Sequence, residues 1–281
     1  MKKAYLLLPI FFLASCSSSN DDTESSNNNG NNNSSGPVLV TKMVADGDTS
    51  TFTYSGSKIS QIKNISTGEV TLFGYSGDLI TQQVTTGSNI SYKTTYSYDG
   101  NGRLSKKIYM ETHLTSGGTS TVETNYSYLS SNSVKITYTA NFTGTSATRT
   151  GTKTATLNAD GSLSSWTETA SVPNNTGGFH SATGSLQPIE YDTKNTPFKN
   201  ITGFLKIVDT EDENGSSHNI LSYNNLLNYN NGTGGAEWGI FKSVYEYNTS
   251  GYPTKNVRTY YNKTGTGVTN SELNTYEYNH L

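Results

Sequence analysis

The sequence predicts an all-β protein: an antiparallel meander of repeated β-hairpins that forms one large curled sheet. Aliphatic residues are sparse, whereas 20 tyrosines and 27 glycines occur among the 281 residues, and tyrosine favours strands while glycine favours turns. Ring-bearing and polar residues alternate along many segments, and one turn motif recurs. Whether the sheet closes like a barrel, how many strands it has and whether copies of the chain associate stay open at this stage.

The first residues look like an export signal. A charged start, Met1–Lys3, precedes a short apolar run and the tetrapeptide Leu13-Ala14-Ser15-Cys16. About ten apolar residues are too few to span a bilayer, which needs roughly 20. The tetrapeptide resembles the lipobox of bacterial lipoproteins, which implies removal of residues 1–15 and attachment of diacylglycerol and an acyl group such as palmitate to Cys16. The alternative is an ordinary secretory signal that contains a cysteine.

Residues 16–36 are predicted to be a disordered tether behind the lipidated cysteine. Residues 17–36 are Ser, Asn, Asp, Gly, Thr and Glu without one apolar side chain, so they cannot bury anything. About 20 residues of coil reach on the order of 25 Å. Asp21 and Asp22 resemble a short acidic export signal of some Gram-negative lipoproteins. We therefore expect an outer-membrane lipoprotein displayed at the cell surface, with the periplasm-facing orientation as the alternative.

From residue 37 to residue 281 the chain reads as a single β-repeat domain. Each repeat has a tyrosine, a tight turn and then an aliphatic residue, as in Tyr54 to Ile59 and Tyr75 to Ile80. Asp-Gly and Asn-Gly dipeptides in these turns tolerate the left-handed backbone that hairpins need. We expect each copy to be a β-hairpin that pairs with the next one. Further copies start near Tyr126, Leu157, Tyr245 and Tyr276.

Alternation gives each strand two different faces. In the segment 91–98 the even positions carry Tyr, Thr, Tyr and Tyr, whereas the odd positions carry Ser, Lys, Thr and Ser. Successive side chains of a strand point to opposite faces, so one face is rich in rings and the other is polar. A polar face with lysine and glutamate disfavours a barrel that spans a membrane. A closed barrel would therefore be a soluble one.

One stretch departs from this pattern, and one or two short helices are predicted near 196–228. Thr196, as N-cap, and Pro197 precede apolar residues at helical spacing up to Leu205. The segment 219–227 is a second, weaker helix candidate because it is rich in asparagine. The segment 209–215 between them is predicted to be a polar loop. These elements are expected to plug or cap one end of the curled sheet.

The turn segment Tyr96-Ser-Tyr98-Asp99-Gly100-Asn101-Gly102-Arg103-Leu104 resembles the YD repeat of Rhs-type shell proteins. From residue 37 to the last residue the chain is similar to uncharacterised Gram-negative lipoproteins that combine a lipobox, an Asn/Ser-rich tether and degenerate repeats. The segment 190–198 also resembles that group. The resemblance implies a domain of unknown function with a porin-like β-fold, and it brings no functional residues with it.

Reactive chemistry has little support in the sequence. The formal net charge is −3 without a basic block, so nucleic acid is not an expected partner. The single cysteine allows no disulfide. The four histidines are isolated, and Asp46-Gly-Asp48 and Asp99-Gly-Asn101 lack the further ligands of a calcium loop. Glu168 and Glu190 are no better a glycosidase pair than Glu111 or Glu123. We expect neither a metal nor another cofactor, and no enzyme.

The two tryptophans, Trp166 and Trp238, are the weak candidates for a ligand-binding site because an indole can stack on a sugar ring. Packing in the core or on a sheet face is the simpler interpretation of both. The first hypothesis is a non-catalytic, lipid-anchored cell-envelope protein whose β-repeats act as a scaffold or interaction module, with an envelope protein or a glycan as partner. The alternative is a surface carbohydrate-binding lipoprotein that serves glycan uptake. A third hypothesis is a lumen that holds an apolar ligand.

Overall fold

The computed structural model describes residues 36–144, 148–174, 177–208, 216–230 and 235–280. The predicted signal peptide, Cys16, the tether up to residue 35 and the loop 209–215 lie outside this part of the chain. Within it, an all-β architecture is confirmed. The strands are β1 (Val40–Ala45), β2 (Asp48–Ser55), β3 (Lys58–Asn64), β4 (Val70–Ser76), β5 (Leu79–Thr86), β6 (Ile90–Tyr98), β7 (Leu104–His113), β8 (Thr119–Ser130), β9 (Ser133–Asn141), β10 (Thr148–Leu157), β11 (Leu163–Pro173), β12 (Phe179–Leu186), β13 (Glu190–Tyr191), β14 (Ile220–Tyr229), β15 (Ala236–Tyr247), β16 (Pro253–Tyr261) and β17 (Val268–Tyr278).

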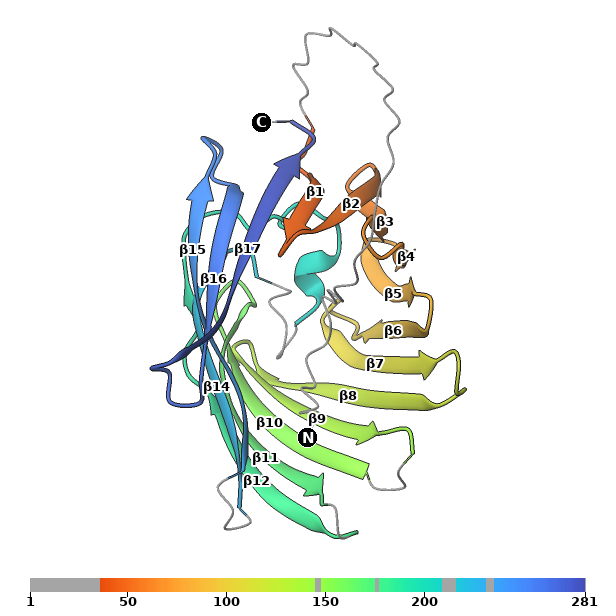
Figure 1. Cartoon of the computed structure of the whole chain (residues 1–281), viewed down its shortest axis with the longest axis vertical. Coiled ribbons are helices and arrows are strands. Elements are labelled where there is room, and N and C mark those ends of the chain that lie inside the picture. Colours follow the sequence, from red (N-terminus) through yellow and green to blue (C-terminus); the bar gives the residue numbers. More distant parts are fainter. Residues whose placement is uncertain (1–35, 145–147, 175–176, 209–215, 231–234, 281) are drawn as a thin grey trace, which may run out of the picture.

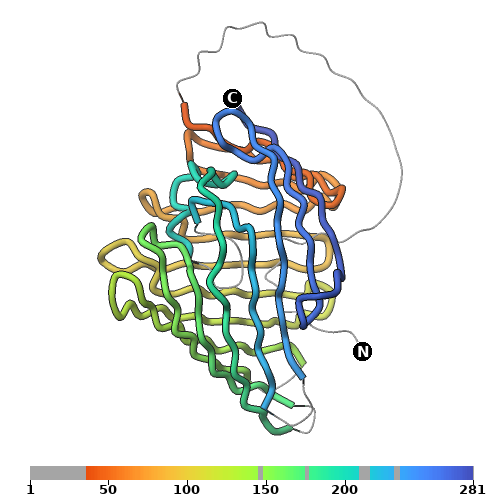
Figure 2. Tube along the Cα trace, turned by 90° about the vertical axis from the view of Figure 1, so that its left-hand side faces the viewer, coloured from red at the N-terminus to blue at the C-terminus, as the bar shows by residue number. Residues whose placement is uncertain are grey.

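The strands form a closed antiparallel barrel. They pair in chain order, and β1 pairs with both β2 and β17, so the sheet closes on itself (Figure 1). Both β12 and the two-residue β13 pair with β14, which leaves 17 − 1 = 16 strand positions around the barrel. Figure 2 shows the strands of two opposite sides crossing steeply. The predicted meander of hairpins is therefore confirmed, and closure is settled.

The recurring tyrosine and aliphatic residue lock each hairpin to an earlier one. Ile59, Ile80 and Leu104, the aliphatic residues that follow three of the turns, are 0% exposed. The tyrosine before a turn reaches back with its hydroxyl: Tyr98 donates to the carbonyl oxygen of Ile80 at 2.7 Å. Tyr54 donates in the same way to the carbonyl oxygen of Val40 at 2.7 Å. The repeat thus links neighbouring hairpins through a buried aliphatic side chain and a tyrosine hydrogen bond.

The turn that resembles a YD repeat is held by its own aspartate. Asp99 Oδ1 accepts hydrogen bonds from the backbone N–H groups of Asn101 and Arg103, both at 2.9 Å. Asp99 Oδ2 accepts from Arg103 Nε at 2.8 Å, and the guanidinium stacks 4.2 Å from the Tyr128 ring centroid. The backbone and side chain of Arg103 lower the pKa of the Asp99 carboxyl. Both carboxylate oxygens of Asp99 therefore stabilise the turn.

The barrel has two different ends, because successive turns of an antiparallel meander alternate between them. The turns after β2, β4 and β6, the start of β1 and the end of β17 share one end. The segment 192–208, which we call the plug, runs from β13 toward β14 at that same end. We call it the plugged end. The turns after β3, β5 and β7 lie at the opposite end.

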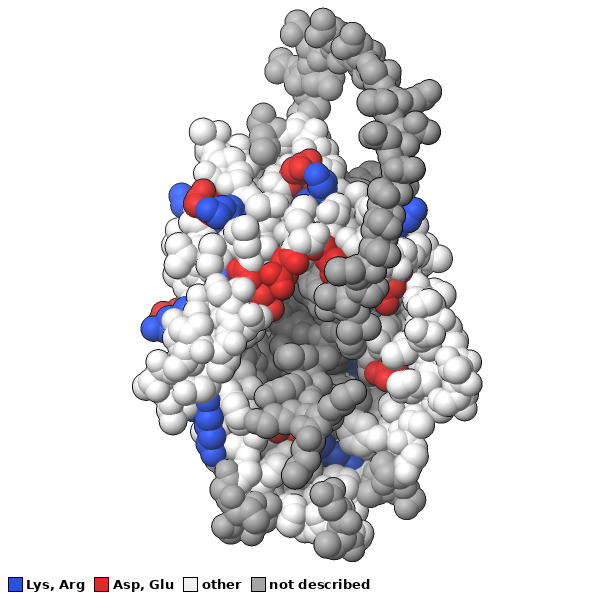
Figure 3. All heavy atoms as spheres, in the orientation of Figure 1, with Lys and Arg blue, Asp and Glu red and all other residues white. Residues whose placement is uncertain are grey.

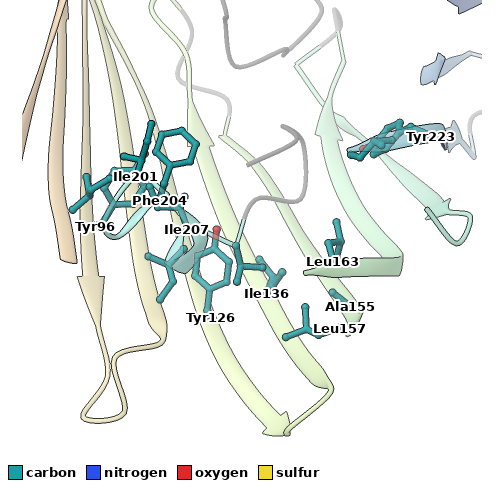
Figure 4. Close-up of a cluster of buried hydrophobic side chains, with 14 of the residues drawn as sticks. Tyr96, Tyr126, Ile136, Ala155, Leu157, Leu163, Ile201, Phe204, Ile207 and Tyr223 are labelled. Carbon is teal, nitrogen blue, oxygen red and sulfur yellow. The ribbon is translucent and has the colours of Figure 1, made fainter. Parts of the chain in front are cut away.

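The plug fills the inside of the barrel near the plugged end. Ile201, Phe204 and Ile207 are buried in one core cluster with residues of the barrel wall. Figure 4 shows these side chains packed beside Tyr96 and Tyr126, which project inward from β6 and β8. Phe198 of the plug contacts Phe204, with ring centroids 5.1 Å apart. The expectation that this segment plugs one end of the sheet is confirmed.

The helix predictions need correction. Within 196–205 the chain makes successive turns, and the one helix in the described residues is a single 3-10 turn, η1 (Phe204–Lys206). The apolar spacing predicts a helix, but successive turns also bring residues three apart to one side, and the chain forms these turns instead. The second candidate, 219–227, is wrong: it lies mostly in β14, where Tyr223 and Leu227 face the core and the backbone pairs with β12 and β15.

The outer wall of the barrel is most uniformly polar on β9 to β12, whereas on β15 and β17 it exposes apolar side chains such as Val244 and Leu273. On each strand from β9 to β12 the buried residues alternate with hydroxyl-bearing ones. The register aligns Thr137, Thr152, Thr169 and Thr183 in one row across the four strands. Thr169 and Thr183 are exposed. In the described residues, no helix is long and apolar enough to cross a membrane.

Candidate ligand-binding lumen

The inner wall between the plug and the opposite end is lined by rings and charged side chains. Figure 3 shows the molecule hollowed at the centre of this view, with acidic side chains on part of the rim. The lining residues come from strands, so their directions follow from register. Lys153, for example, lies between Ile136 and Glu168 on the neighbouring strands, and all three are buried.

An ion pair links two strands that are not neighbours. Arg149 at the start of β10 makes two hydrogen bonds of 2.9 Å to the carboxylate of Glu237 at the start of β15. Tyr229 donates its hydroxyl to the same carboxylate, and Arg149 Nε donates to the Tyr138 hydroxyl at 3.3 Å. The Glu237 side chain is 36% exposed and Arg149 is 12% exposed. This network draws β9, β10, β14 and β15 together at the end opposite the plug.

A second network lies beside the first. The Tyr138 hydroxyl donates to Glu168 Oε1 at 2.6 Å, and Lys153 Nζ lies 4.0 Å from Glu168 Oε2. Burial raises the pKa of the Tyr138 phenol above its usual value, and the Glu168 carboxylate raises it further. The hydroxyl therefore stays protonated and acts as a donor. Lys153 also lies over the indole of Trp166, 4.6 Å from the ring centroid.

Tyrosine–carboxylate contacts recur elsewhere on the wall. Tyr109 donates to Glu111 at 3.3 Å, and Tyr260 donates to Glu272 at 2.9 Å. Burial raises the pKa of Tyr260 to about 12, with Glu272 adding to the effect against the opposing influence of Arg258. The guanidinium of Arg258 stands 4.3 Å from the Phe241 ring centroid. The lumen thus pairs aromatic faces with hydrogen-bonding carboxylates at several positions.

The structure separates the two tryptophans that the sequence singled out. Trp166 on β11 faces inward: it pairs with Ala155 and Leu186, which are buried, and is itself 4% exposed. Trp238 on β15 is half-buried and lies between Glu237, which faces inward, and Gly239, so it points to the outer face. The two indoles cannot form one platform. Cys16, the third predicted site residue, lies outside the described residues.

The carboxylate pair and the histidines are not brought together. Glu168 is buried on the inner wall, whereas Glu190 is exposed on β13 at the plugged end. His113 contacts Glu111 at 2.9 Å, while His218 and His280 contact backbone carbonyl oxygens. Over the described ranges, no three His, Cys, Asp or Glu side chains are grouped so that they could hold a metal ion.

Sequence reasoning missed the Arg149–Glu237 pair. The two residues are 88 positions apart, and neither stands in a motif. The available signal was alternation, which places Arg149 on the same face as Lys153 and Ala155. Alternation cannot say which distant strand lies across the lumen. That requires the register and the closure of the barrel.

Neither a protein-family model nor a curated protein matches the sequence. Two solved structures are similar in fold. A porin-like protein from Bacteroides vulgatus ATCC 8482 superposes with a TM-score of 0.50 at 13% identity, over 86% of this chain and 100% of that one. A porin-like protein from Bacteroides uniformis ATCC 8492 gives a TM-score of 0.43 at 12% identity, over 85% of this chain and 96% of that one. The first superposition shows that the fold is that of a porin-like β-barrel.

Proposed function

We propose that this protein is a non-catalytic, lipid-anchored β-barrel of the cell envelope that acts as an interaction module outside the bilayer. The observation that carries the proposal is the polar outer surface of β9 to β12, combined with the lipobox that ends at Cys16. A barrel that spans a membrane needs an apolar band that faces lipid. Here the corresponding positions on β9 to β12 carry threonine and serine.

The position in the envelope follows from the anchor. A lipid on Cys16 would hold the protein at the outer membrane, and the acidic pair Asp21-Asp22 supports display at the cell surface. The first described residue, Gly36, lies beside His280 at the plugged end. The plugged end therefore receives the tether, which favours a lumen that opens away from the membrane.

Two features support a role without catalysis. The buried carboxylate of Glu168 is already engaged by Tyr138 and Lys153. The plug occupies the apolar part of the interior with its own side chains. That occupation argues against both an open diffusion channel and a lumen for an apolar ligand.

Replacing the lipidated residue tests the anchor. The full-length variant Cys16→Ser should appear in the soluble fraction, and it should lose the incorporation of radiolabelled palmitate that the wild-type protein shows. A variant that alters the tether, Asp21→Asn with Asp22→Asn, is the matched control: it should stay lipidated and membrane-bound, while its exposure to protease on intact cells falls. A Cys16→Ser protein that still sediments with membranes would refute the proposed anchor.

Carbohydrate binding is the second candidate function. The observation that favours it is the aromatic and carboxylate lining of the lumen, because sugars are bound by ring faces together with hydrogen-bonding carboxylates. Glycan-array binding by Trp166→Ala and Trp238→Ala distinguishes a site on the inner face of the barrel from a site on its outer face. Loss of binding in Trp166→Ala alone would support a site in the lumen. Binding that persists in both variants would leave neither tryptophan in a glycan site.

A further inference from the structure

Three tyrosine–glutamate pairs line the lumen in the half of the barrel away from the plug. One pair comes from β7, and the other two come from β14 with β15 and from β16 with β17, which are neighbouring strands. In each pair the tyrosine donates to the carboxylate. The pairs are Tyr109 with Glu111, Tyr229 with Glu237, and Tyr260 with Glu272. A carboxylate oxygen has two acceptor positions, so each pair can still accept a hydroxyl from a ligand.

Trp166 supplies a separate observation on the inner wall, in the core cluster that also holds the plug residues. Its side chain faces the inside of the barrel, is 4% exposed, and its Nε1–H has no hydrogen-bond partner among the residues that the structure describes. A buried donor without an acceptor is costly, and most such donors in proteins are satisfied. An oxygen atom of a bound molecule would satisfy this one.

The charges of the lining decide which class of molecule fits. Glu111 lies 2.9 Å from His113, Glu168 lies 4.0 Å from Lys153 and Glu237 lies 2.9 Å from Arg149. An anionic or cationic ligand would have to displace these partners. A neutral molecule rich in hydroxyl groups can add hydrogen bonds without breaking the ion pairs.

We propose that the lumen binds a neutral oligosaccharide, whose hydroxyls donate to the tyrosine-paired glutamates and whose oxygen accepts from Trp166 Nε1. The proposal rests on the role as an interaction module and names its ligand class. It places no part of the site on the outer wall, so Trp238 is not involved. If no oligosaccharide binds, the expected release of Cys16→Ser from membranes is unaffected. The proposed ligand and the proposed lipid anchor can therefore fail separately.

The test is calorimetric titration of the full-length lipoprotein in a detergent without a sugar headgroup. The probes are neutral hexasaccharides of β-1,4-glucan, α-1,4-glucan, β-1,4-xylan and β-1,4-mannan, with an oligogalacturonate of equal length as the charged comparison. At least one neutral probe should bind, and the oligogalacturonate should bind more weakly. Trp166→Phe keeps a ring but removes the N–H, and it should weaken binding about tenfold, the effect of one hydrogen bond.

Trp238→Phe is the matched control and should bind as the wild type does. It also leaves Trp166 as the only tryptophan, so saturable fluorescence changes in that variant report on the lumen directly. Should Trp166→Phe fold poorly, Glu272→Gln gives a second reading: it retains an acceptor for Tyr260 and should weaken binding several-fold. The proposal is overturned if no neutral probe binds, if oligogalacturonate or a peptide competes better, or if the two phenylalanine variants bind alike.

Discussion

Gly203 illustrates at the scale of one residue why the plug stays where it is. Its φ is +82°, a conformation that side chains other than glycine rarely adopt. A Cβ atom there would stand 2.6 Å from the carbonyl oxygen of Asp78 and 3.0 Å from the backbone nitrogen of Ile80. The neighbouring Thr202 donates its N–H to the carbonyl oxygen of Ser57. The plug therefore meets the hairpin turns backbone to backbone.

The first prediction concerns this contact. Gly203→Ala should lower the free energy of unfolding by more than the roughly 1–2 kcal/mol that a left-handed alanine costs, because two backbone atoms must also move. Gly56→Ala is the control, since Gly56 has a φ of +62° but nothing within 4 Å of the added atom. Urea unfolding measures both variants. Equal losses would mean that the plug is not seated as described.

At the scale of elements, the sequence predicts the individual hairpins, but it does not predict which distant strands lie opposite each other. Alternation and the Tyr–turn–aliphatic repeat predict strands such as β6 and β7 because each depends on neighbouring residues. The segment of β14 was misjudged because asparagines dilute its alternation, and pairing with β12 and β15 decides its conformation. Trp166 was singled out by residue type, and its inward direction follows from the register. The Arg149–Glu237 pair depends on which strands face each other, and no local pattern contains that information.

The second prediction concerns the β6–β7 turn. The pKa of Asp99 is lowered in the folded protein by Arg103, so its stabilising effect is present above the unfolded pKa and is lost as the pH falls through the folded value. Asp99→Asn should remove this contribution: its urea midpoint should lie below that of the wild type near neutral pH, and the difference should shrink in acid, below about pH 4. A constant difference over that range would contradict the role of the ionised carboxylate.

At the scale of the whole molecule, closure of the sheet into a barrel gives it an inner face and an outer face. The seam between β1 and β17 joins residues more than 200 positions apart, including Lys42 and Glu277, whose charged groups are 2.9 Å apart. Once closed, the sheet has no free edge in the described part that could pair with another chain. The tyrosine-rich faces point inward onto the plug and the lumen, and the hydroxyl-rich faces of β9 to β12 point outward.

The third prediction tests the seam. Val44 and Thr275 face each other across β1 and β17, so Val44→Cys with Thr275→Cys should form a disulfide and shift the protein on a non-reducing gel. Closing so long a loop should stabilise the fold by up to about 5 kcal/mol. Val44→Cys with Thr259→Cys, which lies on the next strand, is the matched control and should not cross-link. Cross-linking of the control pair instead would show a different register.

Labelling of one new cysteine on the outer wall tests the central claim most directly. A lipid on Cys16 leaves the mature chain without a free thiol, so Thr169→Cys on β11 would add the only one. With a membrane-impermeant maleimide and membranes free of detergent, the wild-type protein should not label and Thr169→Cys should label quickly. Labelling of the wild type would contradict the anchor. A Thr169→Cys protein that labels only after detergent is added would place this wall in lipid and contradict the account.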